Sequence, residues 1–188
     1  MGGHQDLIVY QQAVLIFDLN VQFCRRFLDP IKDRRTIEQM EQASRSSKQN
    51  IVEGSLGKSL KMNIKLTGVS RASYGELLED YKDFLRIRNL KLWPKEDERV
   101  REIRSMRVQT NKANESNAAD WSNWTNDAER FANLMVTLIS KENYLLDCLL
   151  RSLENKFVTE GGCGENLFKK RLEERNRTNR TNWSNRVN

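Results

Sequence analysis

Residues 7–28 read LIVYQQAVLIFDLNVQFCRRFL, and this stretch decides the fold class. Its apolar side chains recur at intervals of three and four residues, which is the spacing of one face of an α-helix. The face consists of Tyr10, Val14, Phe17, Val21, Cys24 and Leu28, with Ala13, Ile16, Phe23 and Phe27 beside it. A face this broad predicts a long helix that packs against more than one other helix.

The next two helical stretches carry small residues where they are expected to meet. Residues 34–54 present a narrow seam, made of Ile37, Met40, Ser44, Ser47 and Ile51. We expect Gly54 to end this helix in the left-handed conformation. Ser59 is a typical N-cap for a third helix that reaches about residue 90. Gly68 and Gly75 lie inside that helix, where we expect them to let the small seam approach closely.

A fourth helix is predicted at residues 127–157, with Asn126 and Glu129 as its capping box. Four amphipathic helices predict an all-α fold, an antiparallel up-down four-helix bundle over residues 1–160. Residues 95–126 form an inserted linker before the fourth helix, with a short amphipathic helix at 96–108. Trp121 and Trp124 in this insertion favour a hydrophobic clasp on the end of the bundle. Residues 161–188 form a C-terminal extension, with a suffix helix at 165–175 and an Asn/Arg-rich tail.

Composition argues against most catalytic chemistry. The chain has 188 residues and one histidine, His4, which excludes Ser-His-Asp triads, HExxH zinc sites and Glu-x-x-His di-iron sites. We therefore predict a protein that is not an enzyme, with no catalytic residue, metal or cofactor. Its three cysteines lie outside any CxxC motif, and no apolar run is long enough to span a membrane. These features favour a cytoplasmic protein with free thiols and no membrane partner.

Three segments of the chain resemble a known family. They are Asp6-Leu-Ile-Val-Tyr-Gln-Gln-Ala13, then Gln42-Ala-Ser-Arg45 leading into Asn50-Ile-Val-Glu-Gly54, and Ser70-Arg-Ala-Ser-Tyr-Gly-Glu-Leu-Leu-Glu-Asp80. They are similar to bacterial four-helix-bundle proteins of the ribosomal intervening-sequence type, which include the accessory variability determinant proteins of diversity-generating retroelements. The Asn-x-x-Glu-Gly motif is the most specific segment, with Val52 in place of the usual alanine. Glu160-Gly-Gly162 resembles the start of a suffix in a variant of this family.

The resemblance implies a bundle that assembles into a ring, commonly a pentamer, without catalytic activity. For the retroelement members it also implies binding of RNA and of a reverse transcriptase. It marks Arg45, Asn50, Glu53 and Gly54 as a structural motif. A salt bridge, with Glu53 as the partner, is the expected role of Arg45.

The strongest charge anomaly lies between Glu53 and Glu76, where the chain has no acidic residue. This interval contains Lys58, Lys61, Lys65 and Arg71. Cations are disfavoured at a helix N-terminus, whereas a phosphate is favoured there, because free backbone N–H groups point at it. We therefore predict contact with a nucleic-acid backbone. The alternative is a solvated lysine face, or one that contacts Glu76, Glu79, Asp80 and Asp83 of a neighbouring subunit.

Further candidate contacts come from the second helix and the tail. Arg35 and Lys48 have no predicted partner within the second helix. The tail carries Arg177, Arg180 and Arg186 between regularly spaced asparagines, which is typical of an RNA-binding arm or of a disordered repeat.

The sequence thus predicts a homo-oligomeric adaptor that binds RNA and is a candidate accessory protein of a reverse transcriptase. A structural or protein-interaction bundle without a nucleic-acid role is the alternative. Residues 54–59 resemble a P-loop only superficially, because Val52 stands where the first glycine is required. The carboxylates of Glu76, Asp80 and Asp83 favour a solvated or intersubunit face over a magnesium site.

Overall fold

The computed structural model describes residues 4–57, 59–106 and 121–184, and it confirms the all-α class. All regular elements in these ranges are helical. The α-helices are α1 (Ile8–Phe27), α2 (Arg34–Leu56), α3 (Leu60–Ile87), α4 (Glu98–Ser105), α6 (Ala128–Glu160) and α7 (Cys163–Ser184). Two short 3₁₀ turns, η1 (His4–Asp6) and η2 (Ser122–Trp124), precede α1 and α6.

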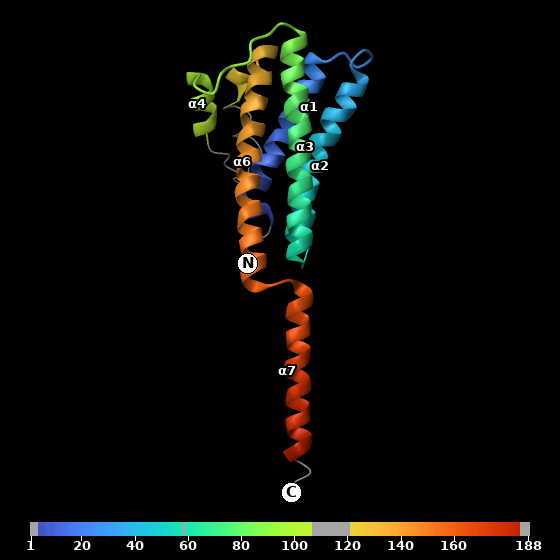
Figure 1. The fold of residues 1–188 in the computed structure, drawn as a ribbon. Helices are drawn as coiled ribbons and strands as arrows, with labels where there is room; N and C mark the ends of the chain where they lie inside the picture. The colour runs from blue at the N-terminus through green and yellow to red at the C-terminus, as the bar shows by residue number, and fades with distance from the viewer. Residues whose placement is uncertain (1–3, 58, 107–120, 185–188) are drawn as a thin grey trace.

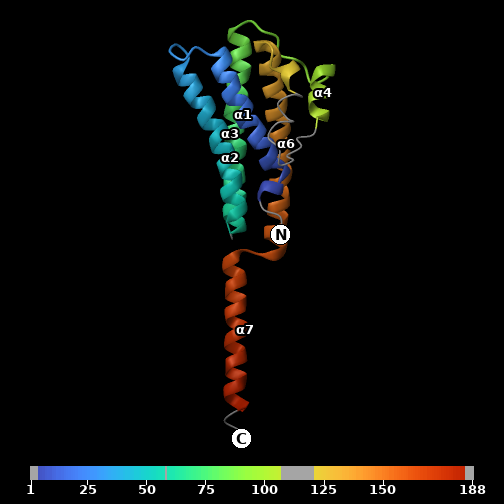
Figure 2. The same ribbon diagram turned by 180° about the vertical axis from the view of Figure 1, so that it is seen from behind.

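Four long helices lie side by side and share one core. Contacts join α1 to α2, α2 to α3, α3 to α6 and α6 back to α1. The connections between successive helices alternate between the two ends of this assembly (Figure 1). Seen from behind, α4 lies on the outer side of α6, and α7 extends away from the end opposite to the α1–α2 loop (Figure 2). No helix in the described ranges is long and apolar enough to cross a membrane.

The buried face of α1 differs from the apolar face predicted for residues 7–28. The most deeply buried side chains of α1 include those of Gln12, Ile16, Asn20 and Phe23. Several predicted members of the face are only half-buried, namely Tyr10, Val14, Phe17, Val21 and Phe27. Two amides enter the core because both have partners there. For example, Gln12 donates from Nε2 to the carbonyl oxygen of Leu138 in α6 at 2.9 Å. A buried amide with partners costs little, so the buried face is shifted relative to the predicted one. Five members of the predicted stripe are still buried, namely Ala13, Ile16, Phe23, Cys24 and Leu28.

Helices α2 and α3 are held together by a hydrogen bond between two serines. Ser70 Oγ donates to the carbonyl oxygen of Ser47 at 3.0 Å. Ser47 Oγ lies 2.8 Å from the carbonyl oxygen of Ala43 in its own helix and 3.3 Å from that of Ser70, so its single proton is shared between them or goes to the nearer one. Both side chains are completely buried. A side-chain hydroxyl reaches the backbone of the facing helix only when the two helices approach closely, so the predicted small seam of α2 is confirmed.

A second buried hydrogen-bond chain joins α1, α2 and α3. Tyr81 donates from its hydroxyl to Asn20 Oδ1 at 2.8 Å, and Asn20 Nδ2 donates to Ser44 Oγ at 3.2 Å. Ser44 Oγ donates onward to the carbonyl oxygen of Glu41 at 3.0 Å. The chain pairs every polar group that it buries, which is the condition under which polar groups are tolerated in a core.

The roles predicted for the glycines are wrong in two respects. Gly54 does not end α2, because the helix continues to Leu56 and its C-cap, Gly57, has φ −68°. Instead, Gly54 is the point of close approach, since a Cβ there would lie 2.9 Å from Asn63 Oδ1 and 3.4 Å from Leu66 Cβ. Gly68 faces open space.

The start of α6 is also capped differently from the prediction. Asp127, and not Asn126, accepts the hydrogen bond from the backbone N–H of Arg130 at 2.8 Å. Glu129 instead accepts hydrogen bonds from the backbone N–H of Lys91 and from Trp93 Nε1, both at 3.1 Å. The carboxylate therefore attaches the segment after α3 to the first turn of α6.

Part of the predicted insertion belongs to the core. Val100 and Ile103 of α4 are buried, so residues 98–105 are not merely a linker. Trp121 and Trp124 are also buried, as the predicted clasp requires, and Trp124 makes an edge contact with Trp93 at 6.3 Å between ring centroids. Residues 107–120 lie outside the described part of the chain.

The C-terminal extension is a longer helix than predicted. Gly161 has φ +75°, a left-handed conformation that ends α6, and α7 then runs from Cys163 to Ser184. Helix α7 shares no packed interface with any other described helix. Phe168 and Leu172 lie one turn apart on it, and Phe168 is 61% exposed.

Alanine substitutions at Gly54 and Gly68 test the close approach of α2 and α3. We expect Gly68→Ala to raise the free energy of unfolding by up to about 1 kcal/mol, since alanine favours helix at an open position. Gly54→Ala should be less stable than Gly68→Ala by about 1 kcal/mol or more, because its methyl group must displace the side chain of Asn63 and presses on Leu66. Urea unfolding measures both, and equal stabilisation by the two substitutions would contradict the packing.

Candidate nucleic-acid interface

Two of the predicted lysines are displayed on the first turns of α3. Lys61 and Lys65 are exposed, four residues apart on one face, and neither forms an ion pair with a described residue. Ser59 caps the helix, since its Oγ accepts a hydrogen bond from the backbone N–H of Met62 at 3.4 Å. Lys58 lies outside the described residues. The two lysines therefore place positive charge at a helix N-terminus, where an anion is favoured.

The turn at Gly161 brings a further lysine to the same end of the molecule. Leu60 of α3 and Lys170 of α7 line one shallow pocket of about 210 Å³. Lys170 is exposed, so with Lys61 and Lys65 it forms what we call the lysine end. The charge pattern did not predict a role for Lys170, although the sequence contains the basic run Lys169-Lys170-Arg171. Its position depends on the path of the chain through Gly161 and Gly162, which periodicity does not predict.

Two other predicted contacts are engaged within the protein. Arg71 Nε pairs with Asp147 Oδ1 at 3.0 Å, which connects α3 to α6. Lys48 Nζ lies 3.8 Å from the centroid of the Phe17 ring, which connects α2 to α1 through a cation–π contact. Both residues have a structural role in this arrangement, and neither adds to the lysine end.

Arg35 lies in a different environment, in a groove between α2 and α3. The groove has a volume of about 1070 Å³ and is also lined by Glu38, Glu76, Glu79 and Asp80. Burial, followed by the neighbouring carboxylates of Asp83 and Glu76, raises the pKa of Asp80. Carboxylates on both sides of the groove repel phosphate, so Arg35 does not extend the lysine end. We call this groove the acidic groove.

The tail arginines are only partly described. Arg177 Nη2 pairs with Glu174 Oε1 at 2.9 Å within α7. Arg180 lies within the helical range of α7, but its side chain is outside the described residues, as is the whole of Arg186. One interpretation of this tail was a disordered repeat, but α7 is helical as far as Ser184.

The structural motif implied by the resemblance consists of Arg45, Asn50, Glu53 and Gly54, and only Asn50 and Gly54 make the contacts described below. Asn50 Nδ2 donates to the carbonyl oxygen and to Oγ of Ser46, at 2.8 and 3.1 Å, so its amide stays on its own helix. Arg45 and Glu53 are both exposed, and the salt bridge expected between them is not formed. Arg45 and Glu53 are eight residues apart, which is more than two turns of α2 and too far for a direct ion pair. Gly54 alone contributes to the helix interface.

The core contains a buried carboxylate, that of Glu142, which was not among the predicted site residues. Glu142 is completely buried, and neither of its carboxylate oxygens has a hydrogen-bond partner among the described residues. Burial raises its pKa well above the usual range, although the charge of Lys141 opposes this. The neighbouring Tyr74 hydroxyl also lacks a partner, and burial raises its pKa. Glu142 lies four residues after Leu138 and four before Leu146, both of which are buried. This helical spacing was visible in the sequence and places Glu142 on the inward face of α6.

The described residues contain no cluster of His, Cys, Asp or Glu side chains that could hold a metal ion. The three cysteines are free thiols, as predicted. Comparisons with protein families, with curated proteins and with solved structures found no match to the chain. The resemblance to the intervening-sequence proteins therefore stays a prediction.

The buried carboxyl of Glu142 predicts a pH dependence of stability. The pKa of Glu142 is raised in the folded state, whereas an unfolded glutamate titrates at about pH 4.3. Above that pH the Glu142 carboxyl therefore holds its proton more strongly in the folded protein than in the unfolded chain. The free energy of unfolding should therefore fall as pH rises above that value, by up to about 1.4 kcal/mol per pH unit until the folded pKa is passed. Glu142→Gln should remove this slope and stabilise the protein at pH 8.

The control for this experiment is Glu154→Gln, which removes an exposed carboxylate from the same helix. Urea unfolding between pH 4 and pH 8 should give the wild-type slope for this variant. An unchanged slope in Glu142→Gln would show that the carboxyl of Glu142 reaches water.

Proposed function

We propose that the chain is an antiparallel up-down four-helix bundle that assembles with copies of itself and binds RNA through the lysine end. It acts as a non-enzymatic adaptor in this proposal. The observation that carries it is the pair Lys61 and Lys65, which are exposed at a capped helix start and form no ion pair with any residue that the structure describes. Lys170 lies beside that start, and residues 54–75 contain no acidic side chain.

The chemistry of the lysine end fits the backbone of a nucleic acid. Lysine ammonium groups bind phosphates as point charges, and binding releases condensed counterions, so affinity depends steeply on salt. Contacts of this kind carry no base information, so we expect little preference for sequence. A partner that supplies specificity is therefore part of the proposal, and the resemblance favours a reverse transcriptase.

Self-association is supported by apolar surface that the single chain leaves exposed. Val158 near the end of α6 is 82% exposed, and Phe168 of α7 has no packed neighbour helix. Helices in proteins derive most of their stability from packing an amphipathic face, so α7 needs a partner surface. A ring of copies, with the pentamer as the expected form, supplies one.

The acidic groove supports a second candidate function. A neighbouring subunit could place its lysines against Glu76, Glu79 and Asp80 and so satisfy both charges without RNA. In that case the protein is a structural or protein-interaction bundle. The two functions differ in what the lysines contact, and one experiment separates them.

We expect single-stranded RNA to bind with an affinity that falls along a straight log–log line as salt increases. The variant Lys61→Gln/Lys65→Gln should lower that slope by about 1.4, at about 0.7 for each lost phosphate contact. Fluorescence anisotropy with two RNAs of unrelated sequence measures slope and preference together. Absence of RNA binding by the wild-type protein at about 50 mM salt would rule out the adaptor function.

The matched control is Lys32→Gln/Lys91→Gln, which removes the same charge from exposed positions at the opposite end of the helices. Its slope should equal that of the wild-type protein. Light scattering on all three proteins then gives the assembly state, and a wild-type mass near 22.1 kDa would rule out the ring. Dissociation of the Lys61→Gln/Lys65→Gln variant, with no RNA binding by its parent, would support the structural function instead.

A further inference from the structure

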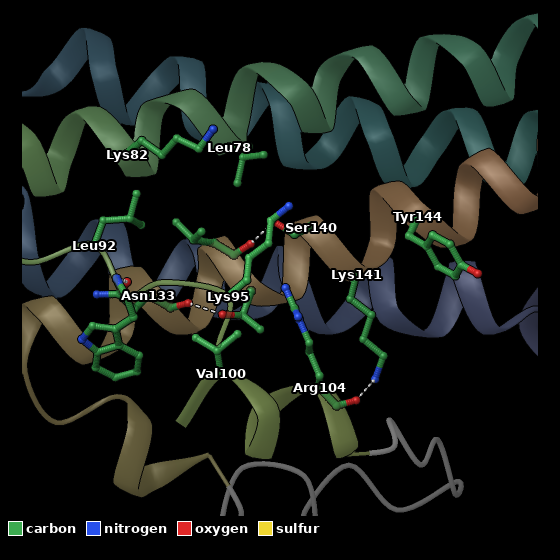
Figure 3. A pocket seen from close by; sticks show the side chains of 13 residues that line it. Leu78, Lys82, Leu92, Lys95, Val100, Arg104, Asn133, Ser140, Lys141 and Tyr144 are labelled. Atoms are coloured by element: carbon green, nitrogen blue, oxygen red, sulfur yellow. Dashed lines mark hydrogen bonds between the residues drawn. The ribbon is translucent and has the colours of Figure 1, made fainter. Parts of the chain in front are cut away.

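A cavity of about 720 Å³ opens between α3, α4 and α6, away from the lysine end (Figure 3). Its floor is one face of α6 between Asn133 and Tyr144. Leu78 of α3 lines one wall, and Val100 of α4 lines the other. This volume is within the range of about 300–1,000 Å³ that is typical of small-molecule sites.

The charged groups of the lining are all positive. They are Lys82, Lys95, Arg104 and Lys141, and no carboxylate of a described residue lines the cavity. Lys82 pairs with Glu79 at 2.7 Å, and Lys141 Nζ donates to the carbonyl oxygens of Arg104 and Met106 at 3.0 and 2.9 Å.

Lys95 and Arg104 therefore remain as cations without an ion pair to a described residue. Figure 3 shows both side chains extending from the α4 side toward the face of α6 that carries Ser140. Both cations line the same cavity and come from one short segment, so an anionic group bound there is attracted to both.

Three neutral polar side chains of the lining are already hydrogen-bonded within the protein, and the exposed hydroxyl of Tyr144 is the neutral polar group of the lining that remains available among the described residues. Thr137 and Ser140 donate to backbone carbonyl oxygens of α6, at 2.8 and 2.6 Å. Asn133 accepts from the backbone N–H of Trp93 at 2.8 Å and donates to the carbonyl oxygen of Lys91 at 2.8 Å. What the cavity offers besides its cations is mainly hydrocarbon.

We propose that this cavity binds a small amphiphilic anion, with its carboxylate or phosphate on Lys95 and Arg104 and its apolar body along α6. A nucleobase fits less well, because its polar edge would find few free donors and acceptors between the cations. The proposal does not depend on RNA binding at the lysine end, and either can fail without the other.

Binding of sodium decanoate, measured by isothermal titration calorimetry on the full chain, tests the proposal. We expect one site per chain, with an affinity up to about fourfold higher for each methylene added between octanoate and decanoate. Decanol, which has the same chain without the charge, and acetate, which has the charge without the chain, should each bind at least tenfold more weakly. Equal binding of decanol or of acetate would overturn the proposal.

The variant Lys95→Gln/Arg104→Gln should lower the affinity for decanoate at least tenfold, because it removes both charge-assisted contacts. Lys91→Gln/Arg101→Gln is the matched control, since both residues are exposed on the same segment and neither lines the cavity. Equal affinity of the two double variants would show that decanoate binds elsewhere.

Two competition arms identify the source of the anion. Decanoate that remains bound in the presence of saturating single-stranded RNA supports a site for a free small molecule, whereas displacement would assign the cavity to RNA. Vesicles of phosphatidylglycerol and phosphatidylcholine test the lipid source. Capture of the protein by these vesicles without binding of free decanoate would overturn the proposal.

Discussion

The close contact between α2 and α3 is the constraint on which the rest of the structure depends. Ser70 donates a hydrogen bond across it to the carbonyl oxygen of Ser47, and a Cβ at Gly54 would lie 2.9 Å from Asn63 Oδ1. Directional hydrogen bonds between two helices fix their relative translation and rotation more tightly than apolar contacts do, because a shift of one helix leaves buried polar groups unpaired. The chain from Tyr81 through Asn20 to Ser44 extends the same constraint to α1. Once α3 is fixed, Lys61 and Lys65 necessarily lie at one end of the molecule.

Helix α6 is the second organising element, because it connects the core to both candidate sites. Its first turns hold the segment after α3 through Glu129 and Asn133, and this places α4 opposite α3 with a cavity between them. Its last turn ends at Gly161, whose left-handed conformation directs α7 so that Lys170 lies beside the start of α3. One helix thus connects the two candidate sites, the exposed lysines at one end and the cavity beside α4.

The sequence predicted the helices better than it predicted their orientations and ends. Periodicity located all four long helices, and the small residues of α2 correctly indicated a close contact. The buried face of α1 was misplaced because Gln12 and Asn20 read as surface residues, and only the tertiary structure shows their partners. The candidate site was predicted in part for the same reason. Lys61 and Lys65 are exposed on α3, but Asp147 engages Arg71 and Phe17 engages Lys48 from distant parts of the chain. The cavity cations escaped detection because they come from three separate segments.

The central claim is that buried hydrogen bonds between helices determine their arrangement. A double-mutant cycle on Tyr81→Phe and Asn20→Leu, followed by urea unfolding, measures the coupling across the contact between α1 and α3. Tyr81→Phe leaves a buried amide oxygen without its donor, and Asn20→Leu leaves a buried hydroxyl without its acceptor. The account predicts that the two effects are not additive, with a coupling energy of about 1 kcal/mol or more. Additive effects within about 0.3 kcal/mol would contradict it, since the two side chains would then act independently.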